Sequence, residues 1–218
     1  RDAQLGAAPL DLARSLRPEP FLESDALEII AEAQKAAGSP APPRLHAERL
    51  VRHVHAILEK KPTVSLPSAL EVLKTRIGDC NEHTALYVAM ARSLGLPARI
   101  AVGLVYLRGA FYYHAWPEVW VEESRGRGLW LPVDPTLNQF PADATHVRLT
   151  RGGLERQAAI LGLVGRARLE ITDIELRPGA TPILVGHAPT DLRPLDLQLP
   201  RRDGSGRGCW SSPGRSRE

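Results

Sequence analysis

The chain has 218 residues, a hydrophobic content of 43% and a formal net charge of +3. This length suits one domain with a sizeable core, and no apolar run reaches the ~18 residues of a membrane span. The positive charge gathers in residues 201–218, where five arginines face one aspartate and one glutamate, so the remaining chain is neutral. A neutral body argues against a nucleic-acid-binding surface.

The composition divides the chain into three expected segments. Residues 1–20 contain alanine and proline with little periodicity and are interpreted as a leader or linker. Residues 21–176 carry the periodic patterns of a folded domain, and residues 177–218, rich in Pro, Gly and Arg, are predicted to be a disordered tail. The chain starts with Arg1, and removal of an upstream signal or membrane segment would place the domain outside the cytoplasm.

Three helical segments are expected before the first cysteine. A helix capped by Ser24 runs to Gly38, where Gly-Ser-Pro ends it. Residues 44–61 show the three-four spacing of an amphipathic helix, which Pro62 is expected to break. A short helical turn covers residues 69–75.

Cys80 begins the next helix, which ends at Gly95. Its residues are small or apolar almost all round, which predicts a helix buried in the middle of the domain. A cysteine in the first turn of such a helix is held rigidly. The free N–H groups and the dipole of a helix N-terminus also favour a thiolate.

The pattern then changes to strands joined by short turns, which indicates an antiparallel sheet. Pro117, inside the second strand, suggests a bulge or an edge position. Helices followed by strands give an α+β fold. The expected strands cover residues 98–107, 111–122, 129–133, 145–150 and 167–176.

Cys80, His114 and Asp134 follow one another in the order of a thiol nucleophile, its base and the residue that orients the base. If the second and third strands pair, His114 and Asp134 lie on neighbouring strands and face the helix of Cys80. This arrangement predicts acyl transfer through a thioester. Cys80 would attack a carbonyl, His114 would move the proton, and Asp134 would fix the imidazole tautomer.

Three sequence blocks show that the chain resembles the bacterial transglutaminase-like superfamily, cysteine acyl-transfer enzymes related in fold to papain. The blocks are Gly78-Asp79-Cys80 with the helix after it, His114-Ala115-Trp116-Pro117-Glu118-Val119-Trp120, and Trp130-Leu131-Pro132-Val133-Asp134-Pro135-Thr136. The resemblance implies a nucleophile helix packed on an antiparallel sheet, with Cys80 as nucleophile, His114 as base and Asp134 as orienter. It implies a protein or peptide substrate and no cofactor. No acidic cluster has calcium-loop spacing.

Other residues are weaker candidates for the site. Asn81 follows the nucleophile, and Trp116 and Tyr112 alternate onto the face of His114, so all three are predicted to contact substrate. Asp143 and His146 are interpreted as loop residues. Papain-like relatives have a Gln, and animal transglutaminases a Trp, shortly before the cysteine. Residues 66–79 contain neither, so the oxyanion hole is expected to use the Cys80 N–H and a second donor that the sequence does not identify.

The residues leave other interpretations open. The chain could be a binding module that keeps the fold without turnover. It could also hold a metal through Cys80, His83, His114 and Asp134, because Cys80 and His83 are three apart on a helix. For the thiol enzyme, hydrolysis and transamidation share the thioester and differ only in whether water or an amine resolves it.

Overall fold

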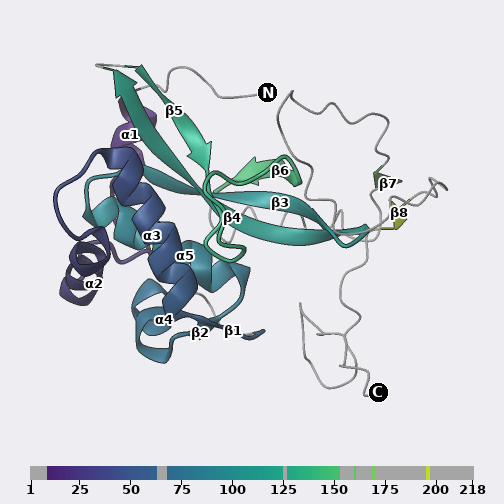
Figure 1. The fold of residues 1–218 in the computed structure, drawn as a ribbon, viewed down its shortest axis with the longest axis horizontal. Helices are drawn as coiled ribbons and strands as arrows, with labels where there is room; N and C mark the ends of the chain where they lie inside the picture. The colour runs from purple at the N-terminus through teal and green to yellow at the C-terminus, as the bar shows by residue number, and fades with distance from the viewer. Residues whose placement is uncertain are drawn as a thin grey trace.

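A computed structural model describes residues 9–62, 68–124, 127–152, 160, 168–169 and 195–196. Helices come first along the chain, and the strands after them form an antiparallel four-stranded sheet in the order β5-β4-β3-β6. The helices gather on one side of this sheet (Figure 1). The α+β fold class is therefore confirmed. Among the helices described, none is both long and apolar enough to cross a membrane.

The elements have the following bounds. The helices are α1 (Pro9–Arg14), α2 (Leu27–Ala37), α3 (Pro43–Ile57), α4 (Ala69–Thr75) and α5 (Cys80–Ser93). The strands are β1 (Glu59–Lys60), β2 (Ile77–Gly78), β3 (Ala98–Leu107), β4 (Ala110–Ser124), β5 (Arg127–Pro132), β6 (His146–Arg151), β7 (Arg168–Leu169) and β8 (Leu195–Asp196).

Helix boundaries differ from the expected ones at two places. α2 begins at Leu27 with Ala26 at the N-cap and no capping side chain, so the predicted cap at Ser24 is wrong. α3 ends at Ile57 because Glu59 and Lys60 leave the helix and pair in parallel with β2. This small parallel pair holds the chain that leads into α5.

The ends of the chain are described only in part. Residues 9–20, within the segment interpreted as a leader, contain α1 and contact the folded unit. The Ala98 N–H donates to the Ser15 carbonyl at 3.0 Å, and Arg92 donates to the Arg17 carbonyl at 2.6 Å. Of the strand expected over 167–176, only β7 is described, and the predicted tail lies outside the described residues except for β8.

α5 is the central helix, as its apolar sequence predicts. Every residue from Glu82 to Arg92 is buried. α2, α3 and α4 pack around it on one side, and β3 and β4 lie against the other. Val119 and Val121 of β4 join the same apolar core as the α5 side chains. The first residue of α5, Cys80, is thereby fixed against the sheet.

Two residues of the sheet affect the position of the site. Pro117 lies in an interior strand without a break in the β3–β4 register, so the expected bulge or edge there is wrong. The Pro117 carbonyl accepts from the Val133 N–H, so the Pro117 nitrogen, which carries no hydrogen, also faces β5. It does so at the point where the β4–β5 ladder begins. Gly103 pairs with His114 of β4 and with Arg148 of β6. A Cβ at Gly103 would lie 2.0 Å from the Val147 carbonyl oxygen, so glycine lets β6 approach closely.

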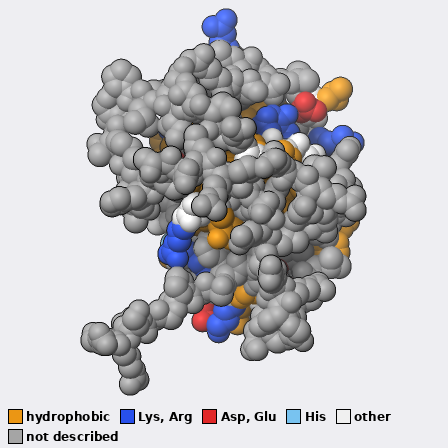
Figure 2. Space-filling view, turned by 90° about the vertical axis from the view of Figure 1, so that its right-hand side faces the viewer, with side chains coloured by type: hydrophobic (Ala, Val, Ile, Leu, Met, Phe, Trp, Pro, Cys, Tyr) orange, Lys and Arg blue, Asp and Glu red, His pale blue; other side chains and the backbone are white. Residues whose placement is uncertain are grey.

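The face seen in Figure 2 carries both positively and negatively charged side chains. The described arginine and lysine side chains visible there occupy several separate places, with acidic and apolar side chains among them.

Candidate active site

The N-terminus of α5 is built by a capping box. The Asp79 carboxylate accepts from the Asn81 N–H at 2.9 Å, and the Glu82 carboxylate accepts from the Asp79 N–H at 2.9 Å. A Cβ on Gly78 would lie 2.2 Å from the Cβ of Glu82, so this turn requires glycine. Burial, with the nearby Glu82 carboxyl, raises the pKa of Asp79 to about 7.

Cys80 occupies the first position of α5 and is 2% exposed. It forms a small apolar cluster with Val102 of β3, Ala115 of β4 and Ile160. Thr84, one turn further along the same helix face, donates its hydroxyl to the Ala115 carbonyl at 3.1 Å. The start of α5 therefore lies against β4 at the residue that follows His114.

His114 and Asp134 form a buried hydrogen-bonded pair. The His114 Nε2 lies 2.7 Å from the Asp134 Oδ2, and the two side chains are 2% and 0% exposed. With Nε2 directed at a carboxylate, Nδ1 is the His114 nitrogen left to exchange a proton with a reacting group. Sequence reasoning placed these residues on neighbouring strands; Asp134 lies just beyond the end of β5.

The chain around Asp134 is held at several points. Asp134 exchanges backbone hydrogen bonds with Gln139, and its Oδ1 accepts from the Leu137 N–H at 2.9 Å. The His55 ring of α3 bonds to the Pro135 carbonyl at 3.0 Å. The Asp134 carboxylate is thus held at Oδ1 by the N–H of its own loop and at Oδ2 by the His114 ring.

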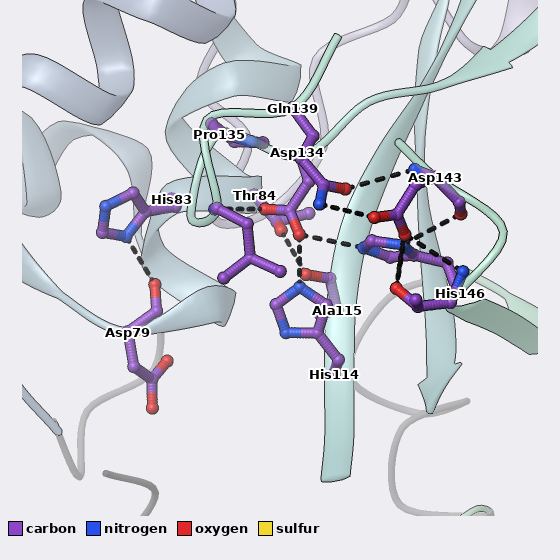
Figure 3. A network of polar contacts seen from close by, with 12 residues as sticks. Asp79, His83, Thr84, His114, Ala115, Asp134, Pro135, Gln139, Asp143 and His146 are labelled. Atoms are coloured by element: carbon purple, nitrogen blue, oxygen red, sulfur yellow. Dashed lines mark hydrogen bonds and ion pairs between the residues drawn. The ribbon is translucent and has the colours of Figure 1, made fainter. Parts of the chain in front are cut away.

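His146 is the residue that sequence reasoning missed. It is the first residue of β6 rather than a loop residue, and its Nε2 lies 3.0 Å from the same Asp134 Oδ2 that His114 contacts. Figure 3 shows both imidazoles directed at the same oxygen of the Asp134 carboxylate. The predicted strand over 145–150 was the available signal, since it put a histidine at the start of an element of the sheet.

The charges in this cluster support one another. Burial alone would raise the pKa of Asp134, but the positive charge and hydrogen bond of His114 and the hydrogen bond from His146 hold it well below its ordinary value. Burial would lower the pKa of His146, but its bonds to Asp134 and Asp143 outweigh burial and raise it to about 9. Asp134 is therefore ionised and His146 is charged at neutral pH.

The predicted substrate-contacting residues have different surroundings. Trp116 is 1% exposed; its ring stacks on His114 with centroids 6.0 Å apart and meets His146 edge-on at 5.1 Å. Trp116 therefore packs against both histidine rings. Tyr112 is half-buried in β4 opposite Val105. Asn81 is half-buried in the first turn of α5, and its Oδ1 has no hydrogen-bond partner among the described residues.

The group with metal-ligand spacing shares His114 and Asp134 with the metal hypothesis but has His146 in place of Cys80 and His83. Among the described residues, ligand-type atoms come within 4.8 Å of one another in His114, Asp134 and His146, where they hydrogen-bond to each other. Cys80 and His83 are not in this group. His83 is fully buried and donates Nδ1–H to the Asp79 carbonyl at 2.7 Å (Figure 3), and burial lowers its pKa to about 4.

Residues 31–135 match the model of a protein family described as the transglutaminase-like superfamily. Uncharacterized proteins of Mycobacterium tuberculosis and Mycobacterium bovis are 33% identical to the chain over 91 residues. That alignment covers 38% of this chain and 29% of each relative, so the chain spans less than a third of their length.

A solved structure shares the fold. A candidate cysteine protease from Cytophaga hutchinsonii superposes with a TM-score of 0.54 and 22% identity, covering 68% of this chain and 50% of that one. The periplasmic domain of TgpA from Pseudomonas aeruginosa gives a TM-score of 0.46 and 23% identity, over 61% of this chain and 49% of that domain. The family match and the Cytophaga structure agree with the helix-on-sheet architecture.

Proposed function

From a chain whose residues 31–135 are transglutaminase-like, we propose a cysteine-dependent acyl-transfer enzyme that acts on an amide bond of a protein or peptide. Cys80 is its nucleophile, His114 its base and Asp134 the residue that orients the base. The buried 2.7 Å pair of His114 and Asp134 carries the proposal. Beside it, Cys80 starts a helix that packs against β4 next to His114.

The proposed reaction has two halves. His114 takes the proton of the Cys80 thiol, the sulfur attacks the carbonyl carbon, and the C–N bond breaks as the amine leaves with that proton, which leaves a thioester on the sulfur. Water or a second amine then attacks the thioester, gives up a proton to His114, and releases an acid or a new amide. Asp134 keeps Nδ1 of His114 toward the reaction, and the Cys80 N–H is the proposed oxyanion donor, because the N–H groups of Asn81 and Glu82 already donate to the Asp79 carboxylate.

Alkylation of Cys80 tests the nucleophile. In a Cys209→Ser background, so that one thiol remains, iodoacetamide labelling is followed against pH by mass spectrometry. We expect the labelling rate to reach half its maximum below pH ~8.5, the ordinary thiol pKa, and His114→Ala to move that midpoint upward. Burial of Cys80 slows labelling at every pH, so the midpoint is diagnostic where the absolute rate is not. A midpoint at the ordinary value, unmoved by His114→Ala, contradicts the proposal.

Activity distinguishes the two outcomes of the thioester. Peptide acyl donors are incubated with and without a fluorescent amine, and Cys80→Ala serves as the blank. Fluorescent product indicates transamidation, and acid formed without the amine indicates hydrolysis. A folded, thiol-reactive protein with neither product would support the binding module instead.

A further inference from the structure

His146 stands in direct contact with the proposed catalytic pair. Its side chain is 3% exposed and turns from the start of β6 toward Asp134 (Figure 3). The Asp134 Oδ2 lies 3.0 Å from the Nε2 of His146 and 2.7 Å from the Nε2 of His114. Two imidazoles therefore share one carboxylate oxygen.

The partners of His146 require both ring nitrogens to carry hydrogen. Nε2 faces Asp134, and Nδ1 faces the backbone carbonyl and the Oδ1 of Asp143 at 3.2 and 3.3 Å. Nδ1 also lies 3.5 Å from the Thr145 Oγ1, whose hydrogen is donated to Asp143, so this oxygen too can only accept. Ionised carboxylates and carbonyls only accept hydrogen bonds, so each nitrogen has to donate. The geometry thus assigns an imidazolium cation, in agreement with the raised pKa of about 9.

The cation is fixed from three directions. Asp143 is tied to Gln139 by two hydrogen bonds, 2.9 and 3.2 Å long, so the carboxylate that faces Nδ1 is itself anchored. The edge of the Trp116 ring packs on the imidazole. The absence of a side chain on Gly103 lets β6 lie close to β3 beside the site.

We propose that His146 is a positioning residue of the active site: a fixed cation that shares the Asp134 carboxylate with His114 and holds that carboxylate in the place from which it orients the base. The inference rests on the proposed function, because it concerns the base of that reaction. Nothing in the thiol–imidazole–carboxylate scheme requires a second imidazole at the carboxylate.

The effect follows from the charges around Asp134. The rings of His146 and His114 lie 5.6 Å apart on the same carboxylate, so the charge of His146 acts directly on the group that orients His114. Asp134 and Asp143 are the acids that face His146, and Lys60 of β1 and His83 of α5 act on Asp134. The charge of Arg148, further along β6, pairs with Glu118. Loss of the His146 charge should therefore weaken the hold on the Asp134 carboxylate and, with it, the placement of His114.

His146→Gln tests the inference because it removes the charge and keeps an amide N–H. His53→Gln is the matched control, since His53 bonds to Glu32 outside the site. All proteins compared carry the Cys209→Ser change. Nitrogen-15 NMR of the protein that retains His146 reports whether this ring carries two hydrogens at pH 7.5 and at which pH it loses one. The pH profile of kcat/KM, on the substrate found in the acyl-donor screen, is compared between the unaltered protein and the two variants.

We expect a doubly protonated His146 at pH 7.5 and a fall in kcat/KM at the pH where this ring loses its proton, near 9; the fall is absent in His146→Gln and present in His53→Gln. A purely structural role would lower the rate of His146→Gln at all pH values and leave this fall in place, and that result overturns the inference. A neutral His146 at pH 7.5 overturns it as well. If the unaltered protein alkylates as an ordinary thiol, the proposed function fails first, and the kinetic role of His146 fails with it.

Discussion

Asp134 has both carboxylate oxygens in use. Oδ1 accepts from the Leu137 N–H, while Oδ2 receives His114 and His146. The carboxylate therefore joins its own loop to β4 and β6. A change at this side chain therefore affects His114 and His146 together, because both bond to the same carboxylate oxygen.

Asp134→Asn should keep the shape and disturb the hydrogen bonds, because an amide offers one oxygen where the site needs an acceptor at both positions. We expect at least a 100-fold lower rate of thiol-dependent turnover, roughly what misplacing a general base costs. The rate is measured on the substrate found in the acyl-donor screen. Glu48→Gln, at an exposed ion pair on α3, serves as the surface control. Equal rates in both variants would remove Asp134 from the reaction.

The sequence predicted the proximity of His114 and Asp134 but not that of His146. The first contact needs only two neighbouring strands with a short turn, which residue patterns reveal. The second depends on the path of residues 135–145, which return His146 to the carboxylate through turns without periodicity. Hydrogen bonds such as that of Gln139 to Asp143 hold this path, and no pattern of apolar residues encodes them.

At the scale of elements, the boundaries set by local signals were predictable and those set by tertiary pairing were not. β3 covers residues 98–107 as expected, and α5 begins at Cys80 behind a capping box. The end of α3 depends on the parallel pairing of β1 with β2, far along the sequence. The helical periodicity therefore predicted a helix that continued to residue 61, beyond its actual end at Ile57. Pro117 is tolerated in the interior of the sheet because its missing N–H faces the end of a ladder.

The junction of α5 and β4 makes its own prediction. Thr84→Val keeps the side-chain shape but leaves the buried Ala115 carbonyl without its hydroxyl partner. We expect a loss of about 1 kcal/mol in the free energy of unfolding, and lower turnover as the start of α5 shifts against β4. Urea unfolding and activity measure the two effects.

Ser93→Ala is the matched control on the same helix. The Ser93 hydroxyl donates to the Met90 carbonyl of its own turn, at the end of α5 away from Cys80. It should cost less stability and leave turnover unchanged. If both variants lose activity alike, the α5–β4 hydrogen bond has no special part in placing the nucleophile.

In the whole molecule, two buried histidines whose pKa values are shifted in opposite directions should make the free energy of unfolding depend on pH. The folded pKa of His146 is about 9, above the ordinary 6.5, so its stabilisation is complete below pH ~6.5 and is lost as pH rises through 9. The folded pKa of His83 is about 4, so its contribution is present above pH ~6.5 and is lost as pH falls through 4. Both contributions are in place near pH 6.5.

His146→Gln should therefore flatten the alkaline decline. Between pH 6.5 and 9 we expect the unaltered protein to lose about 2–3 kcal/mol more than the variant, measured by urea unfolding at each pH. Asp79, with a pKa of about 7, adds a decline common to both proteins. His53→Gln should follow the unaltered curve. Parallel curves for His146→Gln and the unaltered protein would show that the cation adds no stability.

The chain divides into a helical half and a sheet half, so the proposed active site can form only after the two halves have packed together. Cys80 belongs to the helices, whereas His114, Asp134 and His146 all lie in the 33 residues from His114 of β4 to His146 at the start of β6. Neither half holds both the proposed nucleophile and its proposed base. In the proposed mechanism the sulfur reaches these partners only when α5 has docked on the sheet, so the reactivity of the Cys80 thiol would report whether the two layers are joined.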